Sequence, residues 1–213
     1  MRSKNETSGQ KRSFIEKARR AQIITAAVDT IAEVGYPNAS LARIADTAGI
    51  SKGVISYHFA GKDELMDQVV TDIYTEIGES VLPRIMEQQN AADMLRAHVR
   101  GVAGYALTHP GRMATLTQIF THARKADGTP RYGAAETEAL YEPLENLYRA
   151  GQDSGEFRDF DVRVMAVTQQ AALDAMFSYC SLHPDHDLMA YAHELSELLV
   201  HAIRADPPSP APM

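Results

Sequence analysis

The side chains best suited to recognition chemistry lie in one short helical segment in the first third of the chain. Lys52, Ser56, Tyr57 and His58 offer a positive charge, hydroxyl groups and an imidazole. Helical spacing places them outward or sideways, away from the apolar residues of the same segment. Gly53 is unfavourable inside a helix by roughly 1 kcal/mol relative to Ala, which suggests that its backbone approaches another molecule closely. These groups suit the phosphates and base edges of a DNA groove.

The residues before this segment predict a helix-turn-helix that would position it. Apolar residues recur at i, i+3, i+4 and i+7 and form one stripe that must be buried: Leu41, Ile44, Ala45 and Ala48. Gly49 supplies the left-handed conformation that ends a helix tightly, and Ser51 can cap the first N–H groups of the next helix. An ordinary helical hairpin with incidental polarity is the alternative interpretation.

Short motifs surround this segment in a fixed order: Ile24–Ala27, Gly35–Tyr36, Ile44–Ala45, Ala48–Gly53, Tyr57–Phe59 and Lys62–Leu65. Over residues 14–66 they resemble the amino-terminal domain of the TetR family of bacterial transcriptional regulators. Beyond residue 70 the chain is similar to that family in its layout only. The resemblance implies a regulator that binds DNA through its amino-terminal helices.

We expect DNA contacts from Ser40, Arg43, Ser51, Lys52, Gly53, Ser56, Tyr57, His58 and Lys62. Among them, Lys62 matches the family's phosphate-binding lysine by position. Val54 stands where the family frequently has Thr, and Ser56 where it frequently has Tyr. The operator sequence of relatives therefore does not transfer to this chain.

Charge is polarised along the chain. Residues 1–62 carry a net charge of +5 and the remainder carries −12, within a total of −7. A positive end suits phosphate, while an acidic body stays away from the duplex. A basic run could lie near the DNA backbone or form a solvated charged face: Lys11, Arg12, Lys17, Arg19 and Arg20.

Periodicity and turn signals predict an all-α fold, with a three-helix amino-terminal domain and a larger helical ligand-binding and dimerisation core. The expected domains are a disordered basic arm (1–12), the helix-turn-helix domain (13–62), the helical core (63–205) and a disordered tail (206–213). Besides the motif helices, we expect helices at 13–34, from 62 onward, and at 91–108, 136–150, 162–182 and 188–203. Another helix should follow the break at 109–111 and end at about residue 125. Pro83 should kink or end the helix that begins at residue 62 near Leu82.

The last two predicted helices indicate self-association. Their apolar and small residues form a stripe that two subunits could bury together in a four-helix interface. The expected contacts are Ala171, Ala175, Leu188, Leu195, Leu198, Leu199 and Ala202. A helix-turn-helix reader generally needs two half-sites, which favours a homodimer. The alternative is that both stripes face only the chain's own core.

A small-molecule site is expected in the middle of the chain, roughly between Met86 and Met176. Aromatic, Met and polar residues there could line an apolar cavity: Tyr105, Met113, Gln118, Phe120, Thr121, His122, Tyr141, Tyr148, Met165, Gln169 and Met176. Each could equally be plain core. His183 and His186 are interpreted as a solvated helix start, because no third metal ligand is evident, and Cys180 as a packing residue.

Together these patterns favour a cytoplasmic repressor that an apolar or aromatic effector releases from a palindromic operator, without enzyme activity, cofactor or metal. An all-α enzyme is the alternative class, but the sequence holds no evident Gly-rich phosphate loop, nucleophile elbow or metal-ligand set. A DNA-binding regulator without ligand control, or an activator, also stays open. No apolar run approaches the ~20 residues of a membrane helix.

Overall fold

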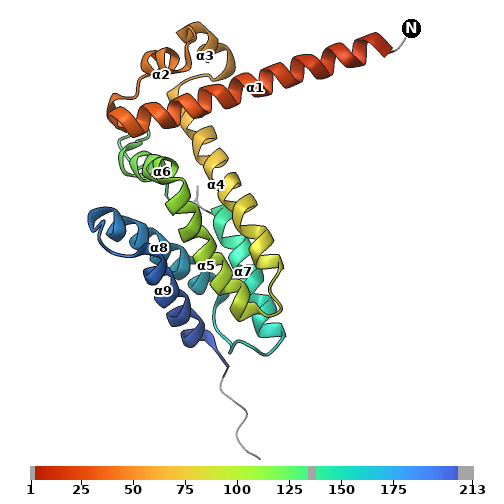
Figure 1. Cartoon of the computed structure of the whole chain (residues 1–213), viewed down its shortest axis with the longest axis vertical. Helices are drawn as coiled ribbons and strands as arrows, with labels where there is room; N and C mark the ends of the chain where they lie inside the picture. The colour runs from red at the N-terminus through yellow and green to blue at the C-terminus, as the bar shows by residue number, and fades with distance from the viewer. Residues whose placement is uncertain (1–2, 134–137, 206–213) are drawn as a thin grey trace, which may run out of the picture. The chain divides into compact units, whose positions relative to one another are not determined.

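The computed structural model describes residues 3–133 and 138–205, which form α-helices, one short 3₁₀ helix and no β-strand (Figure 1). The prediction of an all-α fold is confirmed. The elements are α1 (Ser3–Val34), η1 (Tyr36–Asn38), α2 (Leu41–Ala48), α3 (Lys52–His58), α4 (Lys62–Met86), α5 (Ala91–Thr108), α6 (Pro110–His122), α7 (Glu138–Asp153), α8 (Val162–Leu182) and α9 (Leu188–Ile203). None of these helices is both long and apolar enough to cross a lipid bilayer.

The elements form two compact units. One contains α1, α2, α3, the part of α4 up to Thr75, and Pro110–Arg131 with α6. The other contains Glu76–His109 and the described residues from Tyr132 onward, with α5, α7, α8 and α9. The sequence suggested a division after residue 62, whereas the contacts place the first half of α4 and all of α6 with the helix-turn-helix.

In the first unit the core forms where α1 packs against α2 and α6. Its fully buried side chains come from α1, α4, both motif helices and the residue after α3: Ile23, Ile31, Ile44, Ile55, Phe59, Leu65 and Met66. Gly49 ends α2 in the left-handed conformation (φ 65°), as predicted, so that α3 can start three residues later, at Lys52. The turn therefore brings Ile44 and Ile55 into the same core.

Several helix limits differ from the prediction, and one is the end of α7, which lies at Asp153 instead of residue 150. α1 begins at Ser3, so the arm expected to be disordered over residues 1–12 is helical from residue 3, since extending an existing helix costs far less than starting one. α4 continues through Pro83 to Met86, because the proline lies in the last turn, where its lost hydrogen bond affects only the exposed Glu79. α6 ends at His122 instead of about residue 125. The tail at 206–213 lies outside the described residues.

The core of the second unit is built by α5, α7, α8 and α9. Its buried side chains include Leu95, Val99, Ala103, Leu144, Tyr148, Leu173, Met176, Leu199 and Ile203. Gly151 in α7 leaves room for the ring of Phe157, which follows the turn after that helix. A Cβ on residue 151 would lie 2.1 Å from a ring carbon of Phe157.

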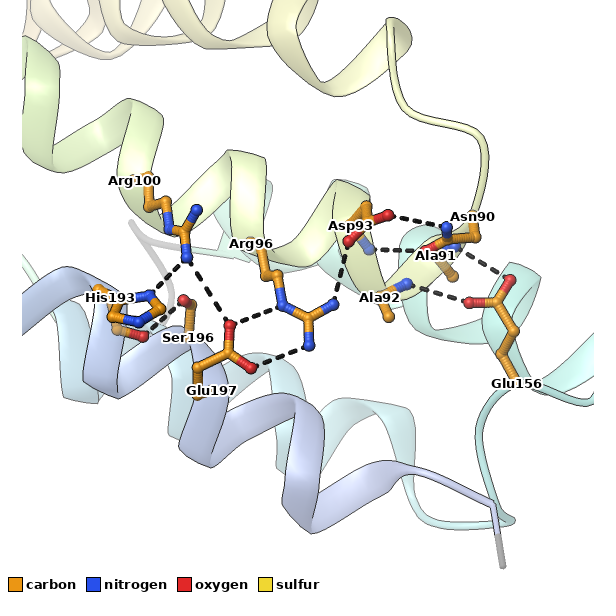
Figure 2. Close-up of polar contacts among 10 residues, drawn as sticks. All are labelled: Asn90, Ala91, Ala92, Asp93, Arg96, Arg100, Glu156, His193, Ser196 and Glu197. Carbon is orange, nitrogen blue, oxygen red and sulfur yellow. Dashed lines mark hydrogen bonds and ion pairs between the residues drawn. The ribbon is translucent and has the colours of Figure 1, made fainter. Parts of the chain in front are cut away.

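Two polar clusters fasten α5 inside this unit (Figure 2). At its start, the carboxylate of Glu156 accepts from the backbone N–H groups of Ala91 and Ala92, at 3.1 and 3.2 Å. Further along, Arg96 donates twice to Glu197 of α9, at 2.7 and 2.9 Å. These contacts satisfy helix-terminal donors and link α5 to α9 with a bidentate charged pair.

Gly151→Ala should lower the free energy of unfolding by about 1–3 kcal/mol, because the added methyl group collides with the Phe157 ring. Gly78→Ala in α4 is the control: no atom lies within 4 Å of its added Cβ. That variant should gain up to about 1 kcal/mol from helix propensity. Urea unfolding followed by circular dichroism measures both changes, and equal stabilities of the two variants would contradict this packing.

Candidate DNA-binding surface

Helix α3 buries one side and presents the other. Ile55 is fully buried, whereas Lys52, Ser56 and Tyr57 are exposed, Tyr57 by 72%. His58 is half-buried and lies edge-on to Tyr57, with ring centroids 5.0 Å apart. An exposed tyrosine, lysine and serine on a helix whose opposite side is fixed in a core form a surface that can meet base edges.

The residues around α2 and the turn add polar groups to this surface. The Ser40 hydroxyl accepts from the backbone N–H of Arg43 at 3.3 Å and so caps α2. Arg43 itself is exposed. The expected capping role of Ser51 is wrong: its hydroxyl makes no capping hydrogen bond. The backbone closes the first turn instead, since the N–H of Val54 donates to the Ser51 carbonyl at 3.0 Å.

Lys62, the first residue of α4, lies partly buried against η1. Its Nζ donates to the carbonyl of Tyr36 at 2.9 Å and lies 4.1 Å from the centroid of the Tyr36 ring. Burial lowers the pKa of Lys62, and the neighbouring Asp63 carboxylate partly offsets that effect. A lysine ammonium has three donors. The contact with Tyr36 therefore orients the side chain and leaves donors for a phosphate.

Helix α1 holds the carboxyl ends of both motif helices. The Gln22 amide donates to the Ala48 carbonyl at the end of α2, at 2.8 Å. Arg20 donates to the carbonyl of His58 at the end of α3 and lies 4.2 Å from the centroid of the Phe59 ring. From the sequence alone Arg20 belongs to a basic run that could lie near the DNA backbone or form a solvated charged face, because no local pattern distinguishes an arginine that caps a distant helix.

The residues expected to line a ligand site do not fall in one compact unit. Five lie on α6 in the first unit, namely Met113, Gln118, Phe120, Thr121 and His122. Six lie in the second unit, namely Tyr105, Tyr141, Tyr148, Met165, Gln169 and Met176. Thr121 and His122 are exposed, and the Gln118 side chain accepts from the backbone N–H of Tyr36 at 3.4 Å.

One buried polar chain does form among the expected residues of the second unit. Tyr148 donates to Gln169 at 2.5 Å, and the Gln169 amide lies 2.8 Å from Nδ1 of His98. Burial lowers the pKa of His98 to about 4, so the imidazole is neutral and accepts at Nδ1. Sequence reasoning missed His98, because only the packing of α5 against its neighbours places it beside Gln169.

The expected dimer residues divide by exposure. Ala171, Ala175, Leu198 and Ala202 are exposed, whereas Leu188 and Leu195 are half-buried against their own core. Leu199 is buried in that core, because α9 packs against α5, so it does not belong to an exposed face as expected. Sequence reasoning left out four exposed large hydrophobic residues of α8: Val164, Val167, Tyr179 and Leu182.

A family model described as bacterial regulatory proteins of the tetR family matches residues 23–69. The HTH-type transcriptional regulator BetI 1 of Chromohalobacter salexigens is 36% identical over 88 residues, 41% of this chain and 42% of that protein. BetI of Escherichia coli is 37% identical over 89 residues, 41% of this chain and 46% of that protein. The chain thus spans less than half the length of these curated relatives.

Solved structures resemble the chain over most of its length. FadR, a fatty acid degradation regulator from Bacillus halodurans, superposes with a TM-score of 0.74 at 21% identity, over 85% of this chain and 94% of that one. SmeT, the repressor of the Stenotrophomonas maltophilia multidrug efflux pump SmeDEF, gives a TM-score of 0.70 at 20% identity, over 91% and 96%. These likenesses concern the fold, while the matched stretch at 23–69 contains α2, α3 and Lys62. Residues 23–69 are therefore similar to bacterial regulatory proteins of the tetR family, and most of the chain shares the fold of these solved structures.

Proposed function

We propose that the chain is a dimeric DNA-binding transcriptional regulator, a repressor that a small apolar effector releases from its operator. One observation carries the DNA-binding part of this proposal. The polar face of α3 is exposed, with Tyr57 at its centre, while Ile55 and Phe59 fix the other side of the segment in a core. This face lies within the stretch that matches the tetR family model.

Base and phosphate contacts divide between two helices. Lys52, Ser56 and Tyr57 are the candidates for base contact, because all three are exposed on the same short helix, α3. Lys62 on α4 is the candidate for phosphate contact, because its ammonium is already oriented by the Tyr36 carbonyl. Phosphate contacts set salt dependence and affinity for any sequence, whereas base contacts set the preference for the operator.

Two subunits would associate through the exposed apolar face of α8 and α9. On α8 it comprises Val164, Val167, Ala171, Ala175 and Leu182, and on α9 Leu198 and Ala202. Contiguous exposed apolar surface on a helix pair is typical of a protein interface. Two copies of the face would bury it in a four-helix arrangement and supply two reading helices for a palindromic operator.

An effector site in the second unit is supported by its neutral polar chain. His98, Gln169 and Tyr148 place hydrogen-bonding groups inside an apolar core without any charge. A core of that kind suits an apolar molecule with one or two polar groups better than an ionic one. SmeT and FadR are, by their descriptions, an efflux-pump repressor and a fatty acid degradation regulator. A hydrophobic effector class for this chain is consistent with both.

Lys62→Ala should weaken binding to operator and random DNA alike and reduce the slope of log K against log salt by about one. Tyr57→Ala and Lys52→Ala should lose operator affinity preferentially, each by roughly 1–3 kcal/mol. Lys125→Ala, which removes the same charge from the loop after α6, is the control. Fluorescence anisotropy of labelled DNA across a salt series measures these effects. Equal losses on random DNA would make Tyr57 and Lys52 backbone contacts.

Leu198→Glu should convert the dimer into folded monomers, because it places a charge in an apolar interface without disturbing the core. Leu198 is 67% exposed within one chain, so the substitution leaves the protomer intact. Leu82→Glu is the matched control on α4, where the leucine is 56% exposed. Analytical ultracentrifugation gives the oligomeric state. A dimer for the Leu198 variant would place the interface elsewhere.

An effector that raises the melting temperature should also lower operator affinity, with a coupling of about 1–3 kcal/mol. Operator DNA must then weaken effector binding by the same factor. A thermal-shift screen of apolar and aromatic compounds finds the ligand, and calorimetry with and without operator measures the coupling. A compound that saturates the protein yet leaves operator affinity unchanged would contradict ligand control and leave the DNA-binding proposal intact.

A further inference from the structure

We propose that Arg20 is a positioning residue for DNA reading: it fixes the carboxyl end of α3 to α1 and α4 without itself touching DNA. The inference rests on the proposed DNA-binding function and names a further residue on which that surface depends. Arg20 lies on α1, far in sequence from the side chains that would meet bases. Its role would be to hold His58 and Tyr57 in the orientation that base contact requires.

The Arg20 side chain is 32% exposed, and its guanidinium contacts several groups of this unit. Nη1 donates to the backbone carbonyl of His58, and Nη2 lies 3.3 Å from the Gln68 side-chain oxygen on α4. Its central carbon lies 4.2 Å from the centroid of the Phe59 ring. Nη2 also lies 3.9 Å from the carboxylate of Glu64. One planar cation therefore joins three helices and the residue that ends α3.

These partners suit a cation at that place. The last carbonyls of a helix lack intrahelical donors and carry partial negative charge, which a guanidinium neutralises. The planar guanidinium of arginine can stack flat on an aromatic ring while N–H groups along its edge donate in fixed directions, a geometry that the compact ammonium of lysine lacks. Glu64 extends the cluster, since its other carboxylate oxygen accepts from the backbone N–H of Ala60 at 2.6 Å. Glu64 and Arg20 thus hold the backbone of the turn between α3 and α4 at Ala60 and His58.

Orientation matters here because α3 has only seven residues. A helix of that length has no stability of its own, so its attachments decide its direction. Direct base contacts need side chains held within about 0.5 Å of the productive geometry. Binding to random DNA depends on charge near phosphates and tolerates a looser helix. Losing Arg20 should therefore cost operator preference more than it costs general DNA affinity.

The neighbouring arginine provides a matched comparison. Arg19 donates to Gln22 on its own helix, at 2.6 Å, and has no described contact with α3. Arg20→Met keeps the apolar stem but removes the charge and the donors, and Arg19→Met makes the same change one residue away. Arg20→Lys keeps the charge but loses the simultaneous contacts with the His58 carbonyl, Gln68 and the Phe59 ring.

The test uses an operator sequence selected from a random DNA pool by the full-length wild-type protein. Binding of that sequence and of random DNA is measured across a salt series, well below the melting temperature of each variant. Arg20→Met should reduce the ratio of operator to random affinity about 5- to 20-fold, as expected when one partly buried hydrogen bond from a charged group is lost. Its salt slope should stay that of the wild type. Arg20→Lys should be intermediate, and Arg19→Met should keep the ratio.

Two outcomes would overturn the proposal. Equal weakening on both DNAs with a salt slope reduced by about one would make Arg20 a phosphate contact. A lower melting temperature with an unchanged ratio, in both Arg20 variants, would make it a residue of fold stability only. Tyr57→Ala distinguishes these failures from failure of the proposed function: its ratio falls if α3 reads bases, whatever Arg20 does. If the wild type enriches no sequence, both proposals fail.

Discussion

The constraint on which the first unit depends is the shortness of its two motif helices. α2 has eight residues and α3 has seven, so neither is stable in isolation. Their order comes from burial of Ile44, Ile55 and Phe59 in the core of this unit. Two side chains of α1 then donate to carbonyls at the carboxyl ends of the motif helices, Gln22 at the end of α2 and Arg20 at the end of α3. The exposed polar face of α3 therefore keeps its position only because other helices of the unit hold the motif helices in place.

Much of this arrangement follows from local sequence patterns. The stripe containing Ile44, the left-handed Gly49 and the limits of α5 and α8 were all predictable, because periodicity and capping residues act within a few positions. Candidate contacts on α3 were predictable for the same reason, since Ile55 and Phe59 define its buried side. The roles of these contacts toward DNA are still predictions.

Features that depend on distant partners were not predictable from the sequence. α6 packs on α1 in the first unit, although its sequence resembles that of any other core helix. Arg20 was indistinguishable from its basic neighbours, and Ser51 has the residue type of a cap but not the hydrogen bond. Leu199 shares a stripe with Leu198, yet one packs into the core and the other faces outward. Apart from Ser51, each case is decided by a packing partner that lies far away in the chain.

The polar chain in the second unit makes that core sensitive to acid. His98 has a pKa of about 4 when folded, against an ordinary value of 6.5. At pH values between these two pKa values, His98 binds a proton in the unfolded chain but stays neutral in the folded chain. The contribution of His98 to stability is therefore complete above the ordinary value and is lost progressively as pH falls toward 4. An uncharged hydrogen-bonding interior therefore makes the folded protein less stable in acid.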